Sequence, residues 1–244
     1  MASANDFNPK ALVQKINLSD DSYKFQTPCA ICISGPQQSG KSSFIVQLVK
    51  HRNLLFTQDF DKCYYCQPAN LCVRPNPIYE QIRQSLPNSE LICGLPDITK
   101  LSLDLDSSCK LVVIDDLMNS LLNSADIVNL LSVHVHHSNI TVIFTLHNYY
   151  AGSRHGKTIS RNLNYTVFFY NRLDLRELKI ISGQIGNNPN FLQECFSFLM
   201  KKFPKENAYV LIDGHFQSEM KAFYIRSHIF PINGQIKPII FFPA

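Results

Sequence analysis

The sequence lacks the features that would place it in a membrane or outside the cell. It contains no long apolar run, whereas a bilayer-spanning helix needs about 20 consecutive apolar residues. Residues 1–6 show no charged segment followed by an apolar one, as a secretory signal peptide would. We therefore expect an intracellular protein without a membrane partner.

Charge is also scarce. Only 17% of the residues are charged, the net charge is +4, and no long run of lysine and arginine occurs. Any contact with nucleic acid must therefore depend on local geometry rather than on a basic tail.

Cysteine is present, but its spacing favours neither a metal site nor disulfides. Cys29 and Cys32, like Cys63 and Cys66, form Cys-x-x-Cys pairs that resemble half-sites for zinc. Both pairs fall in strand-like runs, where residues three apart point to opposite faces of a sheet. We predict buried structural thiols, and we expect no disulfides in a reducing compartment.

The chain has 244 residues, which is enough for one large domain with a full core. No internal repeat or low-complexity linker interrupts it. We predict an N-terminal lead-in over residues 1–27, with a short helix near residues 9–16, followed by a single domain over residues 28–244.

Strands alternate with helices from residue 28 onward, which indicates an α/β fold with a mostly parallel sheet between helix layers. Expected strands span residues 29–33, 62–67, 90–93, 110–114, 140–146, 165–170, 209–212 and 223–229. Expected helices span residues 41–52, 78–86, 97–103, 117–131, 175–185 and 190–202. Residues 148–160 are expected to form a polar loop.

A phosphate-binding loop is the clearest motif. The pattern G-x-x-x-x-G-K-[ST] occurs between an apolar strand and an apolar helix, which is the setting this motif requires. Backbone N–H groups would hold the phosphates, Lys41 would reach the β and γ phosphates, and the Ser42 hydroxyl would coordinate Mg²⁺. The residues expected to bind a nucleoside triphosphate are Gly35, Pro36, Gln37, Gln38, Ser39, Gly40, Lys41, Ser42 and Ser43.

Two adjacent acids, Asp115 and Asp116, follow an apolar strand. A carboxylate at the end of this strand would lie beside the phosphate loop, where Asp115 would hold Mg²⁺ through water. Asp116 would orient and polarise the attacking water. Alternatively, Asp116 caps the helix that begins at Leu117, a role that aspartate fills well.

The next strand is followed by His147 and Asn148. An amide at this strand end would lie near the γ phosphate, where it would position water and sense the phosphate. We assign this role to Asn148, with His147 as the weaker choice. The alternative for Asn148 is an asparagine that starts a turn.

Three cations, Arg154, Lys157 and Arg161, follow in a polar stretch. A cation inserted into a neighbouring subunit's site would stabilise the transition state, as an arginine finger does. The same stretch would alternatively grip DNA phosphates, or be a solvated surface loop.

Several motifs in this order resemble the FtsK/HerA-type genome-packaging ATPases of eukaryotic DNA viruses and of the virus-related Polinton/Maverick elements. The resemblance covers roughly residues 28–230. Its motifs are residues 35–42, 94–97, 113–119, 148, 158–162 and 208–213.

This resemblance implies a P-loop fold of the additional-strand type, a ring of five or six identical subunits, and ATP-driven movement of double-stranded DNA into a capsid. ATP and Mg²⁺ would be the cofactors, with Ser42 and Asp115 on the metal side. Lys41, Asp116 and Asn148 would be catalytic, together with a cation acting on the neighbouring subunit. A capsid or portal protein is a further partner. The protein would work in the host nucleus or cytoplasm at sites of virion assembly, or with the virion itself.

The chain departs from this family at one position. Relatives often carry arginine just before the Thr-Ile-Ser step, where this chain has Lys157. Lysine lacks the planar fork with which arginine clamps phosphate oxygens. The role in the neighbouring subunit's site would then fall to Arg154 or Arg161.

Two other functions remain open on the sequence. One is a small-molecule kinase of the P-loop type, against which the paired acids argue. The other is a non-hydrolysing, nucleotide-gated assembly or adaptor protein. The apolar tail at residues 236–243 is expected to form a last edge strand, or alternatively to dock on a portal or capsid protein.

Overall fold

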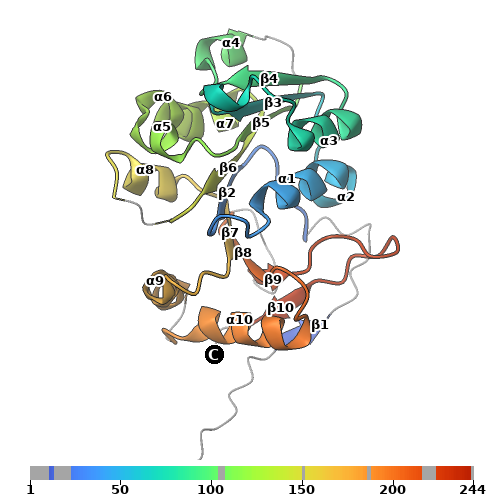
Figure 1. Cartoon of the computed structure of the whole chain (residues 1–244), viewed down its shortest axis with the longest axis vertical. Helices are drawn as coiled ribbons and strands as arrows, with labels where there is room; N and C mark the ends of the chain where they lie inside the picture. The colour runs from blue at the N-terminus through green and yellow to red at the C-terminus, as the bar shows by residue number, and fades with distance from the viewer. Residues whose placement is uncertain are drawn as a thin grey trace, which may run out of the picture.

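One sheet runs through the computed structural model (Figure 1). The structure describes residues 11–13, 23–103, 108–149, 152–185, 188–215 and 224–242. Within these residues the sheet has ten strands, in the order β1-β10-β9-β8-β7-β2-β6-β5-β3-β4. The strands are β1 Ala11–Val13, β2 Ala30–Ser34, β3 Lys62–Gln67, β4 Ser89–Cys93, β5 Lys110–Ile114, β6 Ile140–Leu146, β7 Tyr165–Phe169, β8 Tyr209–Asp213, β9 Ile225–Ser227 and β10 Ile239–Phe241.

The half of the sheet from β7 to β4 is parallel, and the other strands pair antiparallel. Strand β6 lies between β2 and β5, so one additional strand separates the phosphate loop's strand from that of the two acids. Every residue of β2, β5 and β6 is buried, as expected where helices cover both faces. The predicted α/β fold with a mostly parallel sheet is confirmed.

Helices cover both faces of the sheet (Figure 1). Helices α1 to α3 pack into one hydrophobic cluster, α4 to α8 into a second, and α9 and α10 into a third. The helices are α1 Lys41–Lys50, α2 Arg52–Leu55, η2 Ala69–Leu71, α3 Pro77–Ser85, α4 Ile98–Leu103, α5 Met118–Asn123, α6 Ala125–Asn129, η3 Leu130–His134, α7 Val135–His137, α8 Gly156–Arg161, α9 Leu175–Ile185 and α10 Phe191–Lys202.

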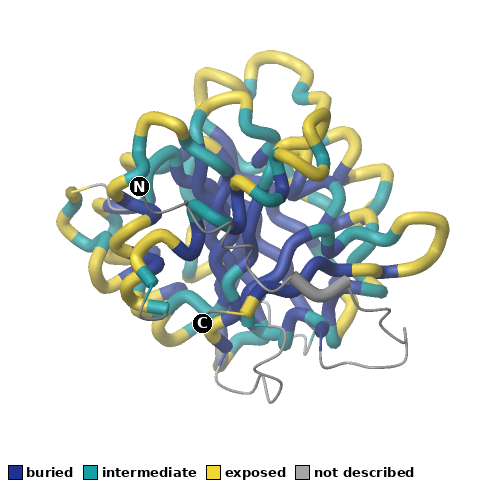
Figure 2. Tube along the Cα trace, turned by 90° about the horizontal axis from the view of Figure 1, so that it is seen from below, coloured by how far each residue is buried: buried dark blue, intermediate teal, exposed yellow. Residues whose placement is uncertain are grey.

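The core lies along the sheet, and the loops around it are exposed (Figure 2). Successive residues of a strand contribute to opposite faces: Ile31 and Ile33 belong to one cluster, whereas Ala30 and Cys32 belong to another. The same alternation separates Cys29 from Cys32 and Cys63 from Cys66, all four buried and reduced. The predicted opposite placement of these thiols is confirmed.

One prediction about cysteine is wrong. Cys72 and Cys93 form a disulfide, with their Cα atoms 6.0 Å apart. Strands β3 and β4 are neighbours, so the segment after β3 comes close to the end of β4. The two cysteines are 21 residues apart in the sequence, and the pairing of β3 with β4 brings them together. The prediction rested only on the expected reducing compartment and did not take this pairing into account.

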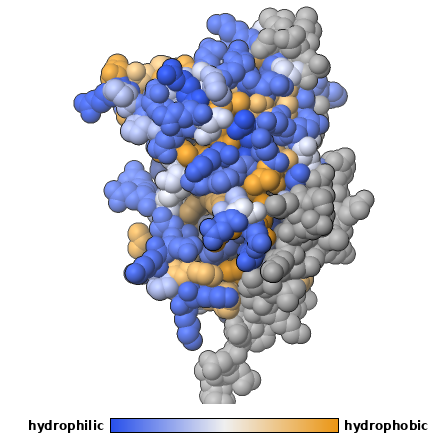
Figure 3. Space-filling view, turned by 90° about the vertical axis from the view of Figure 1, so that its right-hand side faces the viewer, coloured by the Kyte–Doolittle hydropathy of each residue, from blue (hydrophilic) through white to orange (hydrophobic). Residues whose placement is uncertain are grey.

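The face of the molecule drawn in Figure 3 is largely hydrophilic. On the face shown in Figure 3, hydrophilic residues surround smaller hydrophobic areas. No helix among the described residues is long and apolar enough to cross a membrane.

The ends of the chain differ from the predictions. The described part of the expected N-terminal helix is strand β1, which pairs with β10. Strand β10 consequently lies between β1 and β9 and is not the expected edge strand. The side chains of residues 239–241 are buried, which argues against docking of a partner on these three residues.

Two internal segments also differ. The helix expected over residues 117–131 is divided, because Ser124 ends α5 and its hydroxyl accepts a hydrogen bond from the Ile127 N–H at the start of α6. The expected loop at residues 148–160 contains the start of helix α8, which extends to Arg161. Its residue Ile159 is buried in the same cluster as α5, and this packing stabilises the short helix.

A buried ion pair joins the antiparallel strands. The Arg226 guanidinium donates to the Asp213 carboxylate at 3.0 Å, and both side chains are 2% exposed. Arg226 also donates to the backbone oxygen of Tyr23 at 3.1 Å, which ties β9 to the segment before β2.

We predict that Asp213→Asn lowers the free energy of unfolding by about 3–5 kcal/mol, because it leaves a buried guanidinium without its counter-charge. Urea denaturation measures this change. The matched control is Asp126→Asn, on the exposed surface of α6, which is expected to cost at most about 1 kcal/mol. Equal losses for the two variants would contradict a stabilising role for the pair.

Candidate functional site

The phosphate loop connects β2 to α1, and its two glycines, Gly35 and Gly40, stand where a residue with a side chain would not fit. Gly40 has a φ of 98°, and a Cβ there would lie 2.8 Å from the Asn207 amide nitrogen. At Gly35 a Cβ would lie 2.6 Å from the Cβ of Phe169. The loop therefore follows a path that side chains at these two positions would block.

Lys41 folds back over this loop. Its ammonium group donates to the backbone oxygens of Gly35 and Pro36, each at 2.8 Å, and lies 3.5 Å from Nδ1 of His147. Burial lowers the pKa of Lys41, and the nearby carboxylates of Asp116 and Asp115 oppose this shift. A polyphosphate at the loop would offer this cation charged partners in place of backbone carbonyls.

Asp115 is buried at the end of β5 and accepts hydrogen bonds from three hydroxyl groups. Ser42 and Tyr65 donate to one carboxylate oxygen at 2.9 and 2.8 Å, and Thr145 donates to the other at 2.8 Å. Burial and the adjacent Asp115 raise the pKa of Tyr65, which keeps its hydroxyl protonated as a donor. Ser42 and Asp115 together offer the hard oxygen donors that Mg²⁺ prefers, so these residues fit that ion.

Asp116 has an unusual backbone conformation, with a φ of 56°. Its N–H donates to the Thr145 hydroxyl at 3.0 Å, and its carboxylate lies 3.7 Å from Nε2 of His147. Burial and then Asp115 raise the pKa of Asp116, whereas His147 and Lys41 lower it. Helix α5 is capped by Leu117 without a side-chain hydrogen bond, so the alternative role of Asp116 as a cap is wrong.

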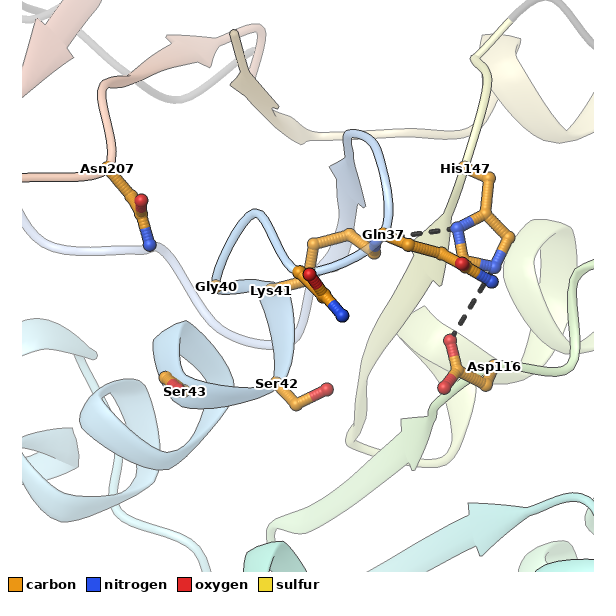
Figure 4. A pocket seen from close by; sticks show the side chains of 9 residues that line it. Gln37, Gly40, Lys41, Ser42, Ser43, Asp116, His147 and Asn207 are labelled. Atoms are coloured by element: carbon orange, nitrogen blue, oxygen red, sulfur yellow. Dashed lines mark hydrogen bonds and ion pairs between the residues drawn. The ribbon is translucent and has the colours of Figure 1, made fainter. Parts of the chain in front are cut away.

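Lys41, Ser42 and Asp116 line one cavity of about 750 Å³. Figure 4 shows His147 and Asp116 beside Lys41, with Asn207 on the other side of Gly40. Most of the wall is the predicted loop and the first turn of α1, namely Gln37, Gln38, Gly40, Lys41, Ser42 and Ser43; the other lining residues are Asp116, His147 and Asn207.

Of the two residues that follow β6, His147 lies nearer the cavity than expected and Asn148 does not line it. His147, the weaker choice on sequence, lines the cavity between Lys41 and Asp116. The Asn148 amide instead donates to Asp174 at 3.4 Å, just before α9. The structure therefore places His147 where an asparagine was expected, and the sensor role of Asn148 stays a prediction.

The cations of the basic stretch are exposed and do not line this cavity in one chain. Arg154 precedes α8, and its N–H contacts the Asn123 side chain at 3.5 Å. Arg161 ends α8, shortly before Asn164, which accepts a hydrogen bond from Ala30 at the start of β2. Arg161 is therefore three residues from a residue that contacts the start of β2, whereas the phosphate loop follows the end of β2. Arg154 instead comes seven residues after His147, which follows the end of β6.

Sequence reasoning missed three residues of this arrangement. Thr145 and Tyr65 hold Asp115, and Asn207 borders the cavity. Thr145 left a signal, since it is a hydroxyl residue near the end of an otherwise largely apolar strand. Tyr65 and Asn207 left none, because only the sheet order brings their strands to the phosphate loop.

Of the comparisons with known proteins, only the one with solved structures found matches. No known family matches the sequence, and no curated protein does. The solved structure of B204, the DNA-packaging ATPase from Sulfolobus Turreted Icosahedral Virus, matches 90% of this chain and 100% of its own, with a TM-score of 0.51 and 13% identity. This chain has the fold of a P-loop NTPase.

Two further solved structures are less similar. The genome packaging NTPase B204 from Sulfolobus turreted icosahedral virus 2, in complex with sulfate, has a TM-score of 0.47 and 14% identity over 89% of this chain and 98% of its own. The KaiC-like protein PH0186 from Pyrococcus horikoshii OT3 has a TM-score of 0.44 and 10% identity over 95% of this chain and 100% of its own.

We predict that Thr145→Val lowers nucleotide hydrolysis about 10–100-fold, because it removes the hydroxyl that holds both Asp115 and the Asp116 N–H. The change is measured as steady-state phosphate release. The control is Thr141→Val, four residues earlier in β6, where the hydroxyl accepts a hydrogen bond from the Cys29 N–H at 3.4 Å. A Thr145→Val protein as active as the Thr141→Val protein would contradict this role.

Proposed function

We propose that this chain is an ATPase that moves double-stranded DNA into a capsid as part of a viral or virus-like packaging machine. The observation that carries the proposal is the position of Asp116, beside the cavity and free of any capping role. The fold shared with a viral DNA-packaging ATPase supports it, as does the order of motifs described above.

In this proposal the phosphates of ATP lie against the loop and the first turn of α1, where N–H groups and the helix dipole favour negative charge. Ser42 and Asp115 would hold Mg²⁺, which would neutralise charge that develops on the phosphates. Lys41 exchanges its bonds to Gly35 and Pro36 for bonds to phosphate oxygens.

Asp116 then orients and polarises the water that attacks the γ phosphate, and it must be ionised to do so. His147 and Lys41 favour the ionised carboxylate, whereas burial and Asp115 oppose it. His147 also lies within reach of Lys41, so it links the cation at the phosphates to the base. Asn148 would transmit loss of the phosphate through its bond to Asp174 at the start of α9.

The proposed site is incomplete in one chain. Of the described residues that line the cavity, Lys41 is the only lysine or arginine, and its ammonium group must serve several phosphate oxygens. We propose that a neighbouring subunit in a ring of five or six supplies a second cation. Arg154 is the better placed candidate, and Arg161 is the alternative.

Asp116→Asn is expected to retain ATP binding and to lose about 10²–10⁴-fold in hydrolysis, because the amide cannot accept a proton. Binding is measured with a fluorescent ATP analogue, and turnover is measured as phosphate release. Asp126→Asn on the surface of α6 is the control and should keep both properties. Hydrolysis at an unchanged rate in Asp116→Asn would contradict the assignment of Asp116 as the residue that polarises water.

ATP turnover measured against protein concentration, with and without long double-stranded DNA, tests the motor itself. A ring motor should show turnover per subunit that rises with concentration and increases further with DNA. Turnover by the monomer that ignores DNA would favour the small-molecule kinase. Nucleotide binding without turnover under any condition would favour the nucleotide-gated adaptor.

Mixing two inactive variants tests the cation from the neighbouring subunit. Lys41→Ala lacks the phosphate-binding cation, and Arg154→Ala would lack the one supplied to a neighbour. In a mixed ring, some interfaces pair an intact Lys41 with an intact Arg154, so activity should return. Absence of recovery with Arg154→Ala, followed by recovery with Arg161→Ala, would move the role to Arg161.

A further inference from the structure

A second cavity, of about 410 Å³, adjoins the phosphate cavity. The two share Gln37, Gln38 and Asn207 as lining residues, so they meet along the outer side of the phosphate loop. The second cavity is bounded by the end of β7 and by the segment that connects α10 to β8. A ligand whose phosphates lie on the loop can therefore extend into it.

The walls of the two cavities differ in chemistry. The phosphate cavity is lined by polar and charged residues. The lining of the second cavity includes four apolar or aromatic residues, Phe169, Tyr170, Met200 and Phe203, and two charged residues, Arg172 and Glu206. A molecule that is charged at one end and flat and aromatic at the other matches this pair of cavities.

The aromatic wall is held in place by its surroundings. Phe203 follows α10, where its N–H donates to the Leu199 oxygen at 2.8 Å. The ring of His228 packs against Phe203 with 4.2 Å between the centroids, and His228 lies 3.2 Å from the Glu206 carboxylate. Tyr170 packs on Phe196 of α10 at 5.3 Å. A flat ligand therefore meets rings whose positions are already set, which lowers the entropy cost of binding.

Asn207 marks the junction between the cavities. Its amide nitrogen lies so close to Gly40 that a Cβ at that glycine would be 2.8 Å away. Figure 4 shows its side chain directed toward the loop at Gly40. An amide carries both donors and an acceptor, which are the partners that sugar hydroxyls need. The group that joins the phosphates to an aromatic base would lie here.

We propose that the second cavity binds the nucleoside of the triphosphate, with the ribose hydroxyls at Asn207 and the base stacked on Tyr170 and Phe203. This inference rests on the proposed nucleotide function and specifies how the site distinguishes a nucleotide from a bare polyphosphate. Every base has a π-face, so stacking of this kind tolerates different bases. Purines should bind better than pyrimidines because they cover more of the wall.

The test compares three ligands by isothermal titration calorimetry in the presence of Mg²⁺: a non-hydrolysable ATP analogue, its 2′,3′-dideoxy form and inorganic tripolyphosphate. Phe203→Ala should weaken the ATP analogue about 5–150-fold, because a base loses its stacking partner. Asn207→Ala should weaken the ATP analogue about 5–10-fold and leave the dideoxy form unchanged. Phe203→Ala should not change the affinity for tripolyphosphate more than twofold.

Two controls match these variants. Phe198→Ala removes a ring of α10, the helix before Phe203, and this ring packs on Phe241. Lys205→Ala changes an exposed residue of the segment that connects α10 to β8 and contains Phe203 and Asn207. Both should bind all three ligands as the unchanged protein does. Lys41→Ala, in contrast, should weaken the ATP analogue and tripolyphosphate together.

Two results would overturn the inference. One is equal affinity of the unchanged protein for the ATP analogue and tripolyphosphate, a measurement that requires no variant to fold. The other is a loss of tripolyphosphate binding in Phe203→Ala as large as the loss of ATP binding. Both leave hydrolysis and its dependence on Asp116 untouched, whereas failure to bind any of the three ligands would overturn the proposed function instead.

Discussion

The hydrogen bonds to the buried carboxylate of Asp115 organise the centre of this protein. Three hydroxyls reach it from three different elements: Ser42 from α1, Tyr65 from β3 and Thr145 from β6. A buried carboxylate needs such partners because its desolvation is costly. The same contacts align the phosphate loop with the strand of the two acids. They also place Asp116, whose N–H shares the Thr145 hydroxyl, at the wall of the cavity.

The antiparallel side of the sheet contributes to the site as well as to the core. Strand β8 pairs antiparallel with β7, and β7 pairs parallel with β2. The segment before β8 therefore lies beside the phosphate loop, which follows β2. This arrangement places Asn207 against Gly40 and Phe203 beside the outer cavity. The chain thus builds the phosphate side of the site largely from its first half and the second cavity largely from its second half.

Predictions from sequence succeeded where the signal was local and periodic. The parallel strands β2, β5 and β6 are largely apolar runs that are buried throughout, and their limits were predicted to within a few residues. Predictions failed where distant partners decide the structure. Strand β1 exists through its pairing with β10, α8 through the burial of Ile159, and the disulfide through the adjacency of β3 and β4.

The sequence by itself determined the phosphate loop, because Gly35, Gly40, Lys41 and Ser42 lie within one short segment between an apolar strand and an apolar helix. It also determined that Asp115 and Asp116 follow a buried strand. Only the tertiary structure placed His147, and not Asn148, among the lining residues of the cavity, excluded the capping role of Asp116 and brought Asn207 to the loop. Those outcomes depend on the direction in which a side chain leaves a strand end and on which strands are neighbours, and long-range packing sets both.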